Sequence, residues 1–255
     1  SSTGMDRYNV KVSADTKLTN NWSSGFTANY ITTSIDKAVT SGNGLLRTVY
    51  AAPPSYDLAG IPSHVDGNPY TQNSFRGSFD NAYWAMDNNK FTEDTNRFFG
   101  NVYASYQTDF GTTNHKLNAK YMVGVDAYTT HYVDSYGYGS NTGGGRGQIE
   151  NYGWTNATYN SLLTINYDWR INEDWGLNAV LGNEIIQSNR KKYYEYGTNY
   201  NFPGWNHINN ATTQQTEEET WKNRTVGFFG NVSASYKNML YLTLTGRQDY
   251  VSNMP

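Results

Sequence analysis

Two groups of aromatic and polar side chains are the parts of this sequence best suited to binding a ligand. Each group places an aromatic ring within a few residues of amide or carboxylate groups: Tyr83, Trp84, Asp87 and Asn88 in the first, and Trp205, Asn206 and Asn209 in the second. A sugar ring has an apolar face that packs on an aromatic ring and a rim of hydroxyls that hydrogen-bonds to amides and carboxylates. These residues are therefore our candidates for ligand contact. The alternative is that they pack the loops against each other or against a partner protein.

No residue pattern predicts catalysis or a metal site. The histidines, His64, His115, His131 and His207, have no H-x-x-H spacing and no carboxylate at a metal-ligand spacing. We expect His115 at the start of a strand and the other three in loops. The glycine run at 143–147 lacks the Lys-Ser/Thr of a phosphate-binding loop, and the chain has no cysteine. We expect no enzyme activity, no cofactor and no bound metal, and a net charge of −3 gives no support for nucleic-acid binding.

The strands that must position these residues are indicated by a nine-residue sequence that occurs twice. Residues 98–106 and 228–236 have nearly the same sequence, FFGNVYASY and FFGNVSASY. Each alternates with a period of two, which places successive side chains on opposite faces of an extended strand. The same alternation predicts four hairpins, with strands at 6–16 and 22–33, 97–109 and 115–130, 157–169 and 175–189, and 224–236 and 239–250.

The connections between these expected strands differ sharply in length. Each hairpin is closed by a turn of a few residues, whereas successive hairpins are joined by long polar segments at about 34–96, 131–156 and 190–223. In an up-and-down antiparallel sheet, all the short turns lie at one end and all the long loops at the other. The first long segment also contains a short expected helix at 45–52, which ends at Pro53.

Loop asymmetry and strand length are both typical of outer-membrane β-barrels, which have short periplasmic turns and long extracellular loops. The expected strands have about 10 to 15 residues, and a tilted strand needs ~9–11 residues to cross a bilayer. The sequence therefore predicts an all-β fold: an antiparallel, up-and-down transmembrane β-barrel segment of about eight strands in four hairpins, with long extracellular loops. The alternatives are a small closed outer-membrane barrel that acts as an adhesin or enzyme, and a soluble β protein that binds carbohydrate.

Five segments of the expected strands and turns resemble a known transporter family. They lie at 6–9 (DRYN), 17–21 (KLTNN), 97–101 (RFFGN), 172–179 (NEDWGLNA) and 236–250 (YKNMLYLTLTGRQDY), and the last is the most specific. They are similar to the middle of the barrel in SusC/RagA-type TonB-dependent transporters of Bacteroidota. The resemblance covers the strands of nearly the whole chain but not the loops.

The resemblance implies a function that residue spacing alone does not. Members of the family form a large barrel in the cell outer membrane with a plug inside, and they import glycans, oligosaccharides or peptides with energy from TonB. It also implies a SusD-like surface lipoprotein as a lid, contact with the TonB complex through the plug, and contact with outer-membrane lipid. Residues 1–255 would form part of one transmembrane barrel domain, because the plug and the remaining strands find no match in this sequence. We therefore expect a segment of a nutrient importer.

Overall fold

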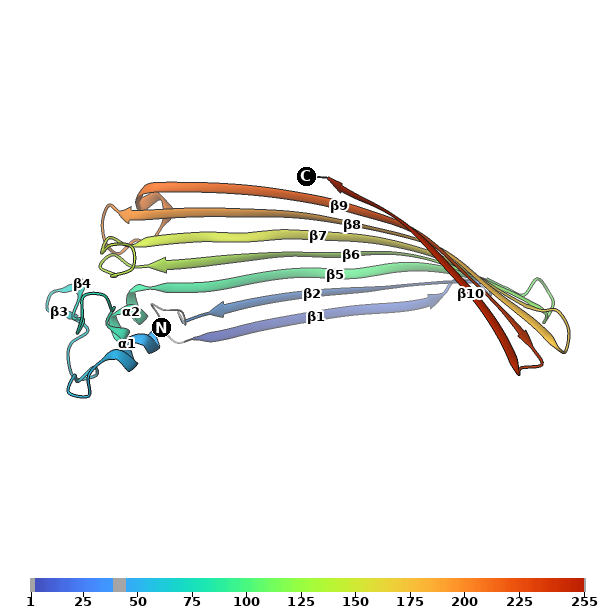
Figure 1. The fold of residues 1–255 in the computed structure, drawn as a ribbon, viewed down its shortest axis with the longest axis horizontal. Coiled ribbons are helices and arrows are strands. Elements are labelled where there is room, and N and C mark those ends of the chain that lie inside the picture. Colours follow the sequence, from blue (N-terminus) through green and yellow to red (C-terminus); the bar gives the residue numbers. More distant parts are fainter. Residues whose placement is uncertain (1–2, 39–44, 255) are drawn as a thin grey trace.

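The computed structural model describes residues 3–38 and 45–254, which form one long antiparallel sheet with loops packed at one end (Figure 1). Within these residues the main sheet has eight strands in the order β1-β2-β5-β6-β7-β8-β9-β10. The strands are β1 Gly4–Lys17, β2 Trp22–Asp36, β5 Lys90–Thr108, β6 His115–Tyr136, β7 Gln148–Arg170, β8 Trp175–Tyr200, β9 Ala211–Tyr236 and β10 Leu240–Met254. The all-β, up-and-down arrangement of four hairpins that the sequence predicts is confirmed.

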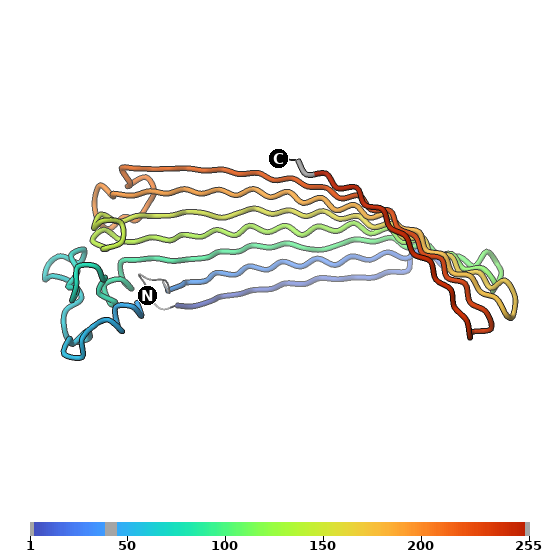
Figure 2. Tube along the Cα trace, in the orientation of Figure 1, coloured from blue at the N-terminus to red at the C-terminus, as the bar shows by residue number. Residues whose placement is uncertain are grey.

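Short turns and long connections lie at opposite ends of the sheet (Figures 1 and 2). The turns between hairpin strands occupy 18–21, 109–114, 171–174 and 237–239. In the last turn, Lys237 and Asn238 have φ angles of 50° and 53°. This left-handed conformation matches the twist of tight hairpin turns, and Asn adopts it more readily than most residues.

The first long connection carries small elements of its own. It contains helix α1 (Leu45–Ala51), strands β3 (His64–Val65) and β4 (Asn68–Gln72), which pair with each other, and helix α2 (Ala82–Asn88). Helix α1 confirms the short helix expected before Pro53, because a proline there cannot continue the helical hydrogen bonds. Neither helix, nor any other in the described part of the chain, is long and apolar enough to cross a membrane.

The expected loop boundaries are wrong, because the strands run much further than the sequence pattern indicates. The expected loops at 34–96, 131–156 and 190–223 are replaced by connections at 37–89, 137–147 and 201–210, the last of which ends in the short helix η1 (Ile208–Asn210). Strands β8 and β9 have 26 residues each. The added segments are rich in Tyr and Thr, which favour strands. Both of their faces are largely polar, however, so they lack the alternation that identified the other strands.

The sheet is open and buries little of its own apolar surface. Among the residues that the structure describes, β1 and β10 each pair with one neighbour only. The largest fully buried side chains lie at the loop end: Trp84, Tyr200, Asn81, Asn210, Ser135 and Ser140. A small core there consists of Ile149, Tyr200 and Ala211. Many large apolar side chains of the strands are instead exposed, and exposed apolar surface of this extent marks a surface that contacts another protein or a membrane.

Candidate ligand surface on the polar face of the sheet

The two faces of the sheet differ in chemistry over the half nearest the short turns. Strand register places alternate residues on opposite faces. One face, called the apolar face below, carries a band of mainly apolar side chains over 159–169 of β7, 175–185 of β8, 226–236 of β9 and 240–250 of β10, with Ser161, Asn183 and Gln248 as its polar members. Leu181 and Leu244 lie well inside this apolar band and are 62% and 67% exposed. The band therefore covers no core of this chain.

Aromatic residues border the apolar band. Those near the strand ends share the apolar face: Trp22, Tyr30, Tyr106, Trp169, Trp175, Tyr236 and Tyr250. At the turn end, the ring centroids of Trp22 and Tyr106 are 5.0 Å apart, and those of Trp175 and Tyr236 are 4.7 Å apart. The band is therefore bounded on the turn side by pairs of aromatic rings in contact across neighbouring strands.

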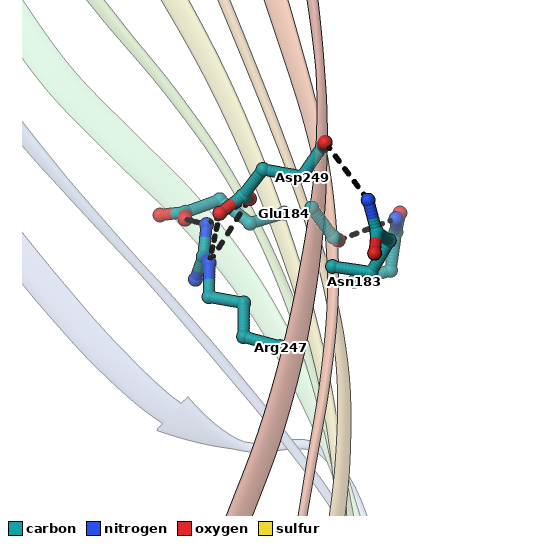
Figure 3. Close-up of polar contacts among 6 residues, drawn as sticks. Asn183, Glu184, Arg247 and Asp249 are labelled. Atoms are coloured by element: carbon teal, nitrogen blue, oxygen red, sulfur yellow. Dashed lines mark hydrogen bonds and ion pairs between the residues drawn. The ribbon is translucent and has the colours of Figure 1, made fainter.

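The opposite face, called the polar face, carries charged groups at the height of the apolar band (Figure 3). Arg247 Nη2 lies 2.8 Å from Glu184 Oε2, and Arg247 Nε lies 3.0 Å from Asp249 Oδ1. In the strand register Gly227 lies between Glu184 and Asp249. Its lack of a side chain makes room for the guanidinium, because a Cβ there would lie 2.6 Å from Arg247 Nη2. One cation between two carboxylates thus joins β8 to β10 across β9.

Beyond the apolar band, towards the long connections, the polar face carries a row of three tyrosines. The register aligns Tyr132 of β6, Tyr152 of β7 and Tyr194 of β8 in one line across the sheet. The rings of Tyr132 and Tyr152 are stacked, with centroids 4.8 Å apart and 6° between their planes, and those of Tyr152 and Tyr194 are 6.4 Å apart. We call these three residues the tyrosine row.

Each tyrosine of the row lies near a carboxylate. The pairs are Tyr132 with Glu93, Tyr152 with Asp134, and Tyr194 with Glu150. The Oη of Tyr152 donates to Asp134 Oδ2 at 3.0 Å. Burial, with these nearby negative charges, raises the pKa of all three phenols, and burial also raises the pKa of Glu150. The tyrosine row therefore presents protonated hydroxyls beside carboxylates. The remaining lone pairs of the carboxylates can accept hydrogen bonds from a ligand.

Cations and tryptophans flank the tyrosine row on its turn side. Arg190 lies over both Trp154 and Trp221, 5.3 and 5.6 Å from their ring centroids. Lys192 Nζ lies 3.6 Å from Glu219 Oε1. Cation–π contacts of this kind hold the guanidinium between the indole rings. The surface thus combines aromatic rings with charges of both signs, which suits a ligand rich in hydroxyl, amide or charged groups. In residues 3–38 and 45–254, no group of three His, Cys, Asp or Glu side chains could hold a metal ion.

The first predicted group of ligand-contact residues lies on helix α2, where only part of it is accessible. Asn81 caps the helix, its side chain accepting hydrogen bonds from the backbone N–H groups of Tyr83 and Trp84. Trp84 is 1% exposed, and its Nε1 donates to the backbone oxygen of Pro69 at 2.8 Å. Trp84 therefore packs the loop, which was the alternative to ligand contact. Tyr83 and Asp87 are exposed on the helix.

The second predicted group lies in the 201–210 connection. Trp205 is stacked against both Phe202 and His207, with ring centroids 5.8 and 5.0 Å away. The backbone N–H of Asn209 donates to His207 Nδ1. Trp205 is 44% exposed, so part of its ring remains available to a ligand or a partner protein.

The structure brings the two predicted groups together. Asn206 Nδ2 donates to the backbone oxygen of Asn88 at 2.9 Å, across 118 residues of sequence. The 201–210 connection is thus tied directly to the end of helix α2. Trp84 is too buried to contact a ligand. Ligand contact by the other six residues stays a prediction, and the contacts observed here are all within the chain.

A carboxylate joins the first long connection to the second. Asp80 accepts hydrogen bonds from Gln72 Nε2 at 2.8 Å, Ser140 Oγ at 2.6 Å and the backbone N–H of Asn141 at 2.7 Å. Gln72 Nε2 also donates to the backbone oxygen of Gly139. The connections at 37–89, 137–147 and 201–210 therefore form one packed assembly at the loop end of the sheet.

The sequence did not predict the tyrosine row, because its members fall in segments that were expected to be loops. His131 falls in one of these segments and was therefore also expected in a loop. It lies in β6, hydrogen-bonded to and stacked on Tyr193. His64 lies in β3, and His115 begins β6 as expected. The one usable signal was the recurrence of aromatic and charged residues at every second position of 132–136 and 190–196.

Comparison with known proteins finds likeness in structure only. No protein-family model matches the chain, and no curated protein sequence matches it. The RagAB peptide importer matches with a TM-score of 0.75 and 14% identity in its open-open state, and with 0.74 and 13% in its closed-closed state. A further structure of the RagAB peptide transporter matches with 0.71 and 12%. Each match covers 98% of this chain and 28% of the other. The chain thus shares the fold of a region little longer than a quarter of those proteins.

Proposed function

We propose that this chain forms part of the wall of an outer-membrane barrel that imports an oligomeric nutrient. The observation that carries the proposal is the apolar band, which runs over 175–185 of β8 between aromatic borders and has charged groups on the opposite face. A tilted strand needs ~9–11 residues to cross a bilayer, and barrel strands alternate between lipid-facing and lumen-facing side chains. In this arrangement the apolar face contacts lipid and the polar face lines the lumen.

The open edges support a larger barrel rather than a small closed one. Within the described part of the chain, β1 and β10 each lack a second neighbour, and every unpaired backbone group within lipid costs several kcal/mol. Further strands must therefore pair with both edges. The match to 28% of a longer barrel protein supports the same conclusion. We infer that those strands, and a plug that contacts the TonB complex, belong to the complete transporter.

Three observations support the nature of the cargo and of the partner protein. The tyrosine row and its charged flanks lie on the lumen side above the apolar band, where they would meet a glycan, oligosaccharide or peptide on its way in. The matched structures are of a peptide importer named RagAB. Together with the resemblance to SusC/RagA-type transporters, this supports a SusD-like surface lipoprotein as the lid. In this proposal the chain binds and conducts its cargo and performs no bond chemistry.

Single-cysteine labelling of the complete protein in intact cells tests the membrane placement. The chain itself contains no cysteine, so Asn209→Cys, Asn238→Cys and Leu244→Cys each add one defined thiol. A maleimide on a polymer too large for porins should label Asn209→Cys in intact cells. It should label Asn238→Cys only after the outer membrane is disrupted, and Leu244→Cys only after unfolding. Labelling of Asn238→Cys in intact cells, or release of the protein without detergent, contradicts the proposal.

Uptake in a deletion strain tests the transport function separately. We expect loss of the gene to slow the removal of either a defined oligopeptide mixture or a maltodextrin mixture from the medium. A protonophore should slow the wild-type strain in the same way, because TonB draws on the proton gradient. Normal uptake of both mixtures by the deletion strain counts against import and favours an adhesin-like barrel.

A further inference from the structure

Three cations gather on the apolar face where the apolar band ends on its loop side. They are Lys191 of β8 and Lys222 and Arg224 of β9. Val226 is the last apolar side chain of the band on β9, and Arg224 is the next residue on that face. We call these three residues the basic patch.

The register keeps the basic patch within the footprint of one headgroup. Arg224 and Lys222 are two residues apart on one strand, so their Cβ atoms lie ~7 Å apart on the same face. Lys191 pairs with Thr220, and Asn189 pairs with Lys222, so the two lysines are diagonal neighbours. Such neighbours are ~7–8 Å apart, within reach of long side chains.

Most of the positive charge in the basic patch is not neutralised by the chain. Arg224 hydrogen-bonds to the neutral side-chain oxygen of Gln187. Lys191 is paired with Glu218 at 2.7 Å, whereas Lys222 has no ion pair with any residue that the structure describes. Apart from Glu218, the nearby positions of the same face are uncharged: Ala127, Ala157, Gln187, Asn189 and Ser252. The patch stands out against a chain whose net charge is −3.

We propose that the basic patch binds the phosphate of a glycolipid headgroup in the outward-facing leaflet. The inference rests on the proposed membrane placement, which sets the loop-side end of the apolar band at headgroup level. Guanidinium and ammonium groups form short charge-assisted hydrogen bonds with phosphate oxygens, and Arg can do so with two parallel bonds. Cations at a membrane surface are also attracted by anionic lipid. Charge complementarity therefore selects a phosphorylated lipid as the occupant, held against β8 and β9 by its acyl chains on the apolar band.

The test compares the complete protein with a Lys222→Gln, Arg224→Gln variant, both extracted from outer membranes in mild detergent. Arg170→Gln with Lys237→Gln is the matched control, because it removes the same charge at the turn end of the sheet. Mass spectrometry counts the phosphorylated lipid A that remains bound to each protein. We expect the patch variant to retain about fivefold less lipid A than the wild type or the control. Equal retention by all three proteins overturns the inference.

Thermal unfolding with added lipid distinguishes binding of the phosphorylated headgroup from binding of free phosphate. Bisphosphorylated lipid A should raise the thermal unfolding midpoint of the wild type and the control, and should leave that of the patch variant unchanged. An equal rise with dephosphorylated lipid A, or with inorganic phosphate at the same concentration, overturns the inference. The membrane fraction reports on the proposed function independently. If wild type and variant are both integrated in the outer membrane but retain equal lipid, the lipid site alone fails.

Discussion

The guanidinium of Arg247 reaches across strand β9 to Glu184. It occupies the space beside Gly227 that a side chain at that position would fill. Nη2 of Arg247 lies 2.8 Å from Glu184 Oε2, and a Cβ on Gly227 would lie 2.6 Å from Nη2 and 2.5 Å from Asp249 Oδ1. Gly227→Ala should therefore displace the ends of both side chains and break the bridge from β10 to β8. We expect a lower thermal unfolding midpoint for the complete protein in detergent.

If Gly227→Ala acts by displacing the Arg247 side chain, a double variant should show it. If Gly227→Ala has already removed the bridge, adding Arg247→Ala should lower the midpoint no further, so the two effects are not additive. Gly246→Ala is the control, since nothing lies within 4 Å of a Cβ built there. Additive effects of Gly227→Ala and Arg247→Ala would show that the glycine acts independently of the ion pair.

The assignment of faces predicts opposite tolerance to charge at adjacent residues of β10. Leu244 lies within the apolar band, while Thr243 lies on the polar face, where its Oγ1 is 2.5 Å from Ser233 Oγ. A lysine on the lipid face near the bilayer midplane costs about 2–4 kcal/mol of folding free energy. Leu244→Lys should therefore lower the unfolding midpoint and the amount of protein in the outer membrane much more than Thr243→Lys. Similar losses at both positions would refute the assignment of faces.

The sequence predicts the turn-side halves of the strands well because one face there is mainly apolar. Leu240, Leu242 and Leu244 alternate with polar residues, and this period of two identifies both the strand and its faces. The outer halves lack that contrast. Around Tyr152 both faces are polar, and the segment is held as a strand by backbone pairing and by cross-strand contacts such as the stack on Tyr132. A pattern based on burial cannot detect a strand that has no buried face.

The candidate site was only partly predictable, because its contacts join segments far apart in sequence. Composition identified Asn88 and Asn206 separately, but nothing local indicates that they meet. Composition also cannot separate a buried tryptophan such as Trp84 from an exposed one such as Trp205. Burial depends on which connections pack together, and that packing is set by polar contacts from residues such as Asp80.

Asp80 should therefore control the order of the loop assembly without affecting the sheet. Asp80→Ala leaves the donors on Gln72, Ser140 and Asn141 without their acceptor, and hydrogen bonds to a charged group are worth about 1.5–3 kcal/mol. We expect faster trypsin cleavage at Arg76 in intact cells, while the unfolding midpoint of the barrel stays the same. Asp87→Ala is the control, because Asp87 is exposed on the same connection. Equal cleavage rates in both variants would show that Asp80 does not hold the assembly.

Glu150 should make the loop-side end of β7, residues 148–156, more stable at mildly acidic pH. Burial, partly offset by the hydrogen bond from Tyr194, raises the pKa of Glu150 above 4.5 in the folded chain. The folded state then binds the proton more tightly than the unfolded state, so stability rises as pH falls through the folded pKa and levels off below the unfolded value. Glu150 lies outside the band residues 159–169 of β7, so it can exchange protons with water.

Hydrogen exchange over 148–156 measures this effect after correction for intrinsic exchange rates. In the wild type, protection should increase from neutral to mildly acidic pH. Glu150→Gln should already show the higher protection at neutral pH and should lose the pH dependence, because its side chain carries no charge to bury. Glu173→Gln, in the turn at the other end of the sheet, serves as the control and should behave like the wild type. A pH dependence that persists in Glu150→Gln would assign it to another group.

Adjacent residues of β7 offer the sharpest test of the ligand surface. Trp154 lies on the polar face beneath Arg190, whereas Thr155 lies on the apolar face. If cargo passes over the tyrosine row, Trp154→Ala removes a ring that a ligand contacts and also frees the guanidinium it positions. Loss of one such anchor should weaken uptake about tenfold at limiting substrate, measured with the oligomer class that the deletion strain fails to import. Thr155→Ala should leave uptake unchanged at equal surface abundance. Because Trp154 also contacts Arg190 and Tyr132, the unfolding midpoint of each variant is measured alongside uptake. Weaker uptake by Trp154→Ala at an unchanged midpoint supports contact with cargo on the polar face, whereas a loss of uptake that follows a lower midpoint contradicts it.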